Sequence, residues 1–125
     1  MTTYHAVVWI DHTQAHVILF DRAHAETHRI HSRSHHKHQG KAADMHALFT
    51  DVAKALLGCK EILLTGPGLA RQQLRDWCVH HHHATAACIV DSVAADHPSD
   101  AQLVAMAKQY FQKFDKMAAD PSIAS

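Results

Sequence analysis

A polar, basic stretch divides this chain into two apolar parts. Residues 24–41 hold six of the fifteen histidines and four of the twelve Lys and Arg residues, with one carboxylate. Between Ile30 and Ala42 no side chain is apolar, so this part of the chain has nothing to place in a core. We therefore expect residues 31–41 to form an exposed, mobile, basic loop that a small domain presents.

The segment before this loop is rich in residues that favour strands. Two apolar runs, Tyr4–Ile10 and Ala15–Asp21, are joined by the polar residues Asp11-His12-Thr13-Gln14, which predicts a β-hairpin. A third run, Ala25–His31, is more polar, as is typical of a strand at or near the edge of a sheet.

The segment after the loop alternates helical and strand patterns. Apolar residues recur at helical spacing in three segments, and two short apolar runs lie between them. The predicted helices are Ala43–Leu57, Leu69–His80 and Ser99–Met117, and the predicted strands are Glu61–Leu64 and Thr85–Val90. The order β-β-β-α-β-α-β-α predicts an α/β domain with a mixed sheet and helices on both faces.

The length of 125 residues suits one domain, which we expect over residues 1–117 with a disordered tail over 118–125. The N-terminal residues have no basic segment of the kind that opens a signal peptide, and no run reaches the ~18 apolar residues of a membrane span. The odd cysteine count and apolar surroundings predict buried free thiols at Cys59, Cys78 and Cys88. These features lead us to expect a cytoplasmic protein.

The basic loop carries the side chains that could contact RNA. Lys and Arg neutralise phosphates, and imidazoles stack on bases or donate to phosphate. Net charge is zero with neutral histidines, so acidification should strengthen polyanion binding. A solvated loop without a partner is the plainer alternative. The candidate RNA-binding residues are Arg29, Arg33, His35, His36, Lys37, His38, Gln39 and Lys41.

A metal site is a second possibility for the same loop. Five of its histidines are close in sequence, but no cysteine or carboxylate accompanies the densest group. We therefore predict no metal and no cofactor, and expect His80–His83 to bind nickel or zinc only adventitiously. The five loop histidines are His28, His31, His35, His36 and His38.

Three functions typical of enzymes have weaker support in the sequence. The segment Thr65-Gly66-Pro67-Gly68 lacks the Lys-Ser/Thr of a phosphate-binding loop and predicts a tight structural turn. A two-metal nuclease needs clustered carboxylates, and those at predicted strand ends are few. A nucleophilic role for Cys78 conflicts with its place on the inward face of a helix. The carboxylates in question are Asp11, Asp91, Glu26 and Glu61.

Several of these features together resemble one protein family. The strand-turn-helix stretch Ile62–Gly68, the basic loop, the His-rich turn and a strand reaching Val90-Asp91 resemble the middle domain of eukaryotic and archaeal class-1 release factors, with their Pelota-like and bacterial relatives. The resemblance covers most of residues 4–97. The chain is also similar to small bacterial translational machinery proteins that share the Asp96-His97-Pro98 segment. The resemblance to release factors implies a ribonuclease H-like fold.

The resemblance also implies what the loop does. In release factors the corresponding loop carries Gly-Gly-Gln, whereas here it reads His38-Gln39-Gly40-Lys41, without the two preceding glycines. We also expect no counterpart of the codon-reading domain, for which 125 residues leave no room. We therefore predict a non-catalytic translation factor that associates with the ribosome or RNA, with no membrane or small-molecule partner and an open oligomeric state. The alternatives are a hydrolase acting on peptidyl-tRNA or RNA, and a metal-binding protein.

Overall fold

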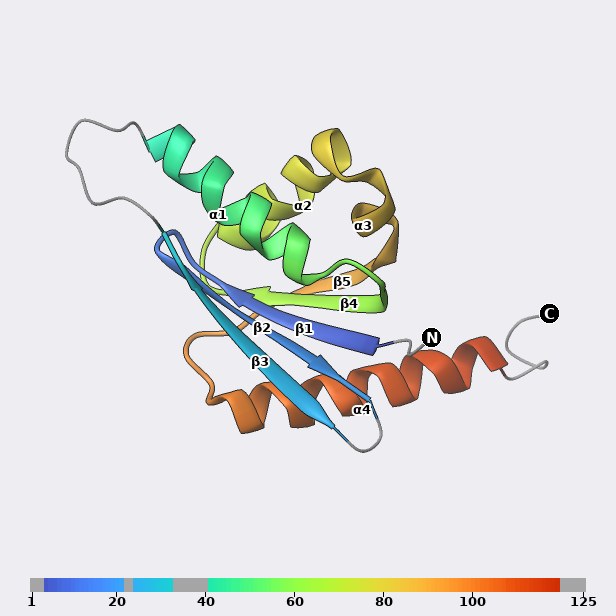
Figure 1. The fold of residues 1–125 in the computed structure, drawn as a ribbon. Helices are drawn as coiled ribbons and strands as arrows, with labels where there is room; N and C mark the ends of the chain where they lie inside the picture. The colour runs from blue at the N-terminus through green and yellow to red at the C-terminus, as the bar shows by residue number, and fades with distance from the viewer. Residues whose placement is uncertain (1–3, 22–23, 33–40, 120–125) are drawn as a thin grey trace.

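The computed structural model describes residues 4–21, 24–32 and 41–119, with the backbone alone at residues 4, 41–44 and 113–119. Five strands form one mixed sheet in the order β3-β2-β1-β4-β5 (Figure 1). The first three strands are antiparallel neighbours, whereas β4 and β5 run parallel to β1. The strands are β1 Tyr4–Ile10, β2 Gln14–Phe20, β3 Ala25–His31, β4 Cys59–Gly66 and β5 Ile89–Ala94. The mixed sheet and the edge position of β3 are confirmed.

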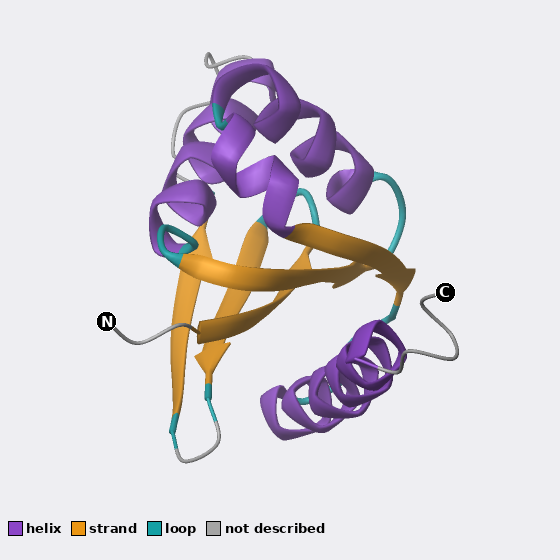
Figure 2. Ribbon diagram, turned by 90° about the vertical axis from the view of Figure 1, so that its right-hand side faces the viewer, coloured by secondary structure: helices purple, strands orange, loops and turns teal. Residues whose placement is uncertain are grey.

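Helices cover both faces of this sheet, as predicted (Figure 2). Three helices lie on one face and a single long helix lies on the other. The first group comprises α1 Lys41–Ala55, α2 Ala70–His81 and α3 His83–Cys88, and the long helix is α4 Asp100–Ala119. Helix α4 begins with a capping box, in which the Ser99 N–H donates to Gln102 Oε1 and the Gln102 N–H donates to Ser99 Oγ.

Helix α3 was not expected. The sequence predicts a strand over Thr85–Val90 after a polar connector at His80–His83, and both predictions are wrong in part. The first two of these histidines end α2, His83 begins α3, and the strand starts only at Ile89. Short apolar runs do not separate helix from strand by periodicity, and the alanines in this run favour a helix. The element order is therefore β-β-β-α-β-α-α-β-α.

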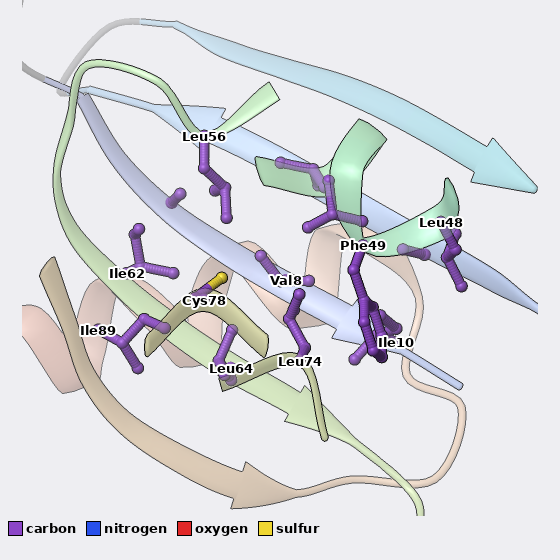
Figure 3. Packing of buried hydrophobic residues seen from close by; sticks show 14 of the residues in the cluster. Val8, Ile10, Leu48, Phe49, Leu56, Ile62, Leu64, Leu74, Cys78 and Ile89 are labelled. Atoms are coloured by element: carbon purple, nitrogen blue, oxygen red, sulfur yellow. The ribbon is translucent and has the colours of Figure 1, made fainter. Parts of the chain in front are cut away.

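Each face of the sheet has its own core. Figure 3 shows part of the larger one, between the sheet and helices α1 to α3. It includes Val8, Leu48, Phe49, Leu64 and Leu74. The smaller core, against α4, comprises Val7, Trp9, Ile18, Phe20, Leu63, Leu103, Ala107 and Phe111. The alternation of residues along β1 between these two cores is the period-two pattern of a strand buried on both faces.

The turn after β4 is the tight structural turn that the sequence predicts. Gly66 has a φ of +139°, and a Cβ at this position would collide with the carbonyl oxygen of Ile10 on the neighbouring strand. Gly68 follows with a φ of +63°. Only glycine adopts such backbone angles at low cost, so this segment brings β4 close to β1 and redirects the chain into α2.

Candidate nucleic-acid interface

Loops that bear polar side chains lie along one edge of the sheet, the edge formed by strand ends and not by an outer strand. Strand β3 runs in the same direction as β1, because both are antiparallel to β2, and β4 and β5 share that direction. The carboxyl ends of four strands therefore meet at one edge, on the left in Figure 1. This edge carries the turns after β1 and β4, the loop between β5 and α4, and the end of β3. In open α/β sheets such an edge is the usual ligand-binding side.

The basic segment, residues 33–41 of the predicted loop, is attached at this edge. At its start, the Ser32 N–H donates to the carbonyl oxygen of Thr13, at 2.7 Å, in the turn between β1 and β2. At its end, Lys41 is the first residue of α1. The structure thus describes where the segment leaves the sheet and where the first helix begins. Six candidate residues lie outside the described residues and keep the status of predictions: Arg33, His35, His36, Lys37, His38 and Gln39.

Arg29 is the candidate residue whose side chain the structure describes, and it has an intramolecular partner. Its guanidinium donates to Asp100 Oδ2 at 3.1 Å, and the imidazole of His16 lies 3.0 Å from Asp100 Oδ1. Burial raises the pKa of Asp100, but the hydrogen bonds and charges of Arg29 and His16 outweigh it and leave that pKa below its ordinary value. With its side chain 63% exposed, Arg29 joins β3 to the start of α4 while remaining accessible to solvent.

An aromatic group lies beside this ion pair. The indole N–H of Trp9 donates to the Asp96 carbonyl oxygen at 2.7 Å. The ring centroid of Trp9 lies 4.8 Å from that of His97 and 5.7 Å from that of His16. Sequence reasoning assigned no function to Trp9 or His16. These contacts fix the loop between β5 and α4 against the end of β1.

The carboxylate of Asp11 supports the turn at the same edge. Its Oδ1 accepts hydrogen bonds from the Thr13 N–H at 2.8 Å, the Thr13 hydroxyl at 2.9 Å and the Gln14 N–H at 2.9 Å. Burial raises the pKa of Asp11, but these hydrogen bonds, together with the nearby His97, bring that pKa below its ordinary value. A carboxylate used in this way holds a turn, in the manner of an Asx motif.

The carboxylates considered for a nuclease lie apart. Asp91 is the third residue of β5 rather than its last, and its Oδ2 accepts from the Tyr110 hydroxyl at 2.9 Å. Glu61 contacts His5 near the start of β4, at 2.8 Å. Within residues 4–21, 24–32 and 41–119, no three His, Cys, Asp or Glu side chains are grouped as a metal ion would require. Residue Glu26 lies on edge strand β3, close to His28.

The cysteines are free, and two of them are buried, as expected; Cys88 is only half-buried. Burial raises the pKa of Cys59 and of Cys78 to about 11 in each case. A thiol with such a pKa is protonated at neutral pH, so neither residue has the character of a nucleophile. In the described part of the chain, no helix has the length and apolar composition needed to cross a bilayer.

A second aromatic group lies on the three-helix face. The indole N–H of Trp77 donates to Nδ1 of His46 at 2.9 Å. The rings of His81 and His82 lie 4.8 Å and 5.1 Å from that of Trp77. We call His46, Trp77, His81 and His82 the Trp77 cluster. No local sequence pattern brings His46 to Trp77, because that contact joins two helices.

Several solved structures have a fold similar to that of this chain. No family model and no curated protein sequence matches the chain. The solved structure of Pelota from Thermoplasma acidophilum is similar over 82% of this chain and 30% of that protein, with 21% identity and a TM-score of 0.59. The archaeal translation termination factor aRF1 is similar over 93% of this chain and 41% of that one, with 14% identity and a TM-score of 0.62. For Dom34 from S. cerevisiae the values are 96%, 33%, 17% and 0.53.

These similarities establish the fold. The chain has the architecture of a domain of Pelota and archaeal release factor proteins, which confirms, for the fold, the resemblance drawn from short sequence segments. It spans 30% to 41% of the length of these proteins.

Proposed function

We propose that this chain is a non-catalytic, cytoplasmic translation factor that binds the ribosome or RNA through the basic, His-rich segment 33–41. The observation that carries the proposal is the attachment of this segment. It follows β3 at the sheet edge where four strands end, in a fold that is shared with proteins described as translation termination factors. Dom34 is described as a factor in RNA quality control that interacts with Hbs1.

Physical chemistry favours RNA phosphate as the ligand of this segment. The segment holds Arg33, Lys37 and Lys41 within nine residues and contains no carboxylate. These cations have no acidic partner within the segment. Their binding to phosphates releases counterions, so the affinity for RNA falls as the salt concentration rises. The absence of aromatic residues from the segment argues for backbone contact rather than base reading.

The order β3-β2-β1-β4-β5 supports a ribonuclease H-like assignment of the fold, which we adopt as part of the proposal. The catalytic activities tied to such relatives are not part of it. The segment has His38 and Lys41 around Gln39-Gly40 rather than two glycines before a glutamine. The described carboxylates hold turns and helices and do not gather around a metal.

Co-sedimentation with bacterial ribosomes tests the proposal. The variant R33A/K37A/K41A leaves Arg29 in place, because that residue also joins β3 to α4. Three phosphate contacts predict that binding falls roughly 20- to 40-fold between 50 and 200 mM salt, and this salt dependence should be lost in the variant. The matched control is K54A/K60A/K108A, which removes the same charge from exposed lysines outside the segment.

The control variant should bind as the parent does. Equal binding by the parent and R33A/K37A/K41A at every salt concentration would overturn the proposal. A peptide-release assay on stalled ribosomes examines the hydrolase alternative. We expect no release above background with the parent or with Q39A, and release that depends on Gln39 would replace the non-catalytic role by a catalytic one.

A further inference from the structure

The Trp77 cluster has a hydrogen bond that specifies a protonation state. An indole N–H is a donor only, so Nδ1 of His46 must carry a lone pair while the 2.9 Å bond exists. His46 is therefore neutral in this arrangement, with its proton on Nε2. A proton that binds Nδ1 from solvent forms an N–H bond there, and the indole then loses its acceptor. Acid thus breaks the contact between α1 and α2 at this point.

The surroundings of Trp77 gain charge under the same conditions. The ring centroids of His46 and His81 are 5.5 Å apart, and the ring of His82 is stacked on the indole at an interplanar angle of 25°. A protonated imidazole carries a positive charge, so acid that protonates these rings places like charges around one aromatic ring. Like charges at such distances repel, which favours movement of these side chains away from one another.

The charged groups on the elements packed here are of both signs, and α1 carries Asp51 and Lys54 beyond His46. Helix α2 contributes Arg71, Arg75 and His80 besides the cluster, and the junction with α3 contributes His83. The acidic group on this part of α2 is Asp76, whose Oδ1 accepts from Gln72 at 3.1 Å. On α1 the side chains of residues 41–44 lie outside the description, and His46 follows Lys41 by about 7.5 Å along the helix axis. The cluster and the basic segment thus share one helix.

We propose that the Trp77 cluster is a second RNA contact that protons switch on. At neutral pH, His46 holds the indole of Trp77; at acidic pH the bond is lost, and the cluster offers imidazolium groups to phosphate and an aromatic ring to a base. The choice of RNA as partner rests on the proposed function, whereas the loss of the bond does not.

Tryptophan fluorescence tests the bond without RNA. The background W9F leaves Trp77 as the only tryptophan, since the chain has two. We expect its emission to change between pH 8 and pH 5. The variant W9F/H46Q keeps an amide oxygen that can accept from the indole but cannot titrate, so most of this change should vanish. An unchanged titration in W9F/H46Q refutes the switch.

Binding of a single-stranded RNA 12-mer, measured by fluorescence anisotropy at pH 6 and pH 8, tests the contact. We expect the parent to bind about tenfold more tightly at pH 6, and H46Q/H81Q/H82Q to reduce this ratio to about threefold or less. The matched control H12Q/H24Q/H28Q removes three exposed or half-exposed histidines outside both the cluster and the segment 33–41, and it should keep most of the ratio.

The outcomes separate the two proposals. If R33A/K37A/K41A binds RNA as the parent does while H46Q/H81Q/H82Q loses the acid increment, the segment is not the main RNA site but the cluster is an RNA contact. If only the segment variants weaken binding, the proposed function stands and the cluster contact is refuted. The acid increment can also be lost only in H35Q/H36Q/H38Q, which removes three histidines of the basic segment, and that result likewise refutes the cluster contact.

Discussion

The two faces of the sheet are stabilised in different ways. On the three-helix face the interior is apolar, and it draws on α1, α2 and the central strands. On the α4 face the apolar core is smaller, and polar bonds lie at the start and near the middle of the helix. Asp100 contacts His16 and Arg29 at its start, and Tyr110 contacts Asp91 further along.

This difference has a consequence for pH dependence. Burial of apolar surface does not change with protonation, whereas an ion pair or a hydrogen bond to a carboxylate does. We therefore expect α4 to respond to pH and to local substitutions more readily than the interior of the three-helix face. The loop from β5 to α4 lies at the sheet edge that bears the basic segment. We therefore expect a pH-dependent opening of α4 to change the side of the domain that is proposed to bind RNA.

The largest expected effect compares one leucine on each face. Leu74 and Leu103 are both fully buried, in the larger and the smaller core respectively. We expect L74A to lower the free energy of unfolding by about 3 kcal/mol, as cavities in a packed core do. For L103A we expect a loss of similar size, about 3 kcal/mol, in the free energy that separates the folded protein from a state in which α4 alone is open.

Native-state hydrogen exchange distinguishes these outcomes, with urea unfolding as the global measure. In L103A the amides of α4 should exchange through an opening of lower free energy than those of β1 and β4. Uniform loss of protection over both faces in L103A would show that α4 does not open separately, and the comparison between the faces would fail.

A smaller effect is expected from Asp100. Its pKa in the folded protein lies below the ordinary value of 3.8, so its contribution to stability is complete above that value and is lost as pH falls through the folded pKa. We expect D100N to lower the free energy of unfolding by about 1 kcal/mol at pH 7, because the ion pair is partly exposed, and by less at pH 3, where the contribution of the carboxylate declines. Urea unfolding at both pH values measures this difference.

The control for D100N is D96N, in the same loop. Asp96 contributes its backbone carbonyl oxygen to the bond with Trp9, so a change to its side chain leaves that bond in place. We expect D96N to unfold like the parent at both pH values. Equal losses in D96N and D100N would attribute the effect to net charge and not to the contacts of Asp100.

Local patterns predicted most of this fold. The bounds of β1 and β3 agree with those read from the sequence, and the three long helices begin and end within three residues of expectation. These elements have clear periodicity, caps or glycine stops, which depend on neighbouring residues. The miss at α3 arose where a short apolar run satisfies both helix and strand patterns, and the choice depended on packing against β4.

The site was predicted less completely, for a related reason. Composition identifies a basic segment, but it does not reveal partners that are distant in sequence. Arg29 and Asp100 are separated by 71 positions, and His46 and Trp77 by 31. Such pairs follow from strand register and helix packing, which no local pattern encodes. Arg29 accordingly gained a structural role that its place in a basic stretch did not indicate.

The smallest expected effect concerns Tyr110, further along α4. Burial raises its pKa first, and the hydrogen bond to Asp91 and the negative charge of Asp91 raise it further. Its contribution to stability is therefore present below the ordinary tyrosine pKa and is lost as pH rises through the raised value. We expect Y110F to lower the free energy of unfolding by about 0.5 kcal/mol at pH 7, the lower end of the net contribution of one hydrogen bond.

Absorbance at 295 nm follows this group, because the chain has two tyrosines. In the Y4F background the remaining phenol, Tyr110, should ionise above the ordinary pKa of 10.0, whereas in Y110F the late phase should be absent. The buried thiols, with pKa values of about 11, also ionise in strong alkali and lie in or beside the larger core. Alkaline unfolding that is the same in Y110F and the parent would therefore point to those thiols, and it would remove Tyr110 from the bonds that make the α4 face sensitive to pH.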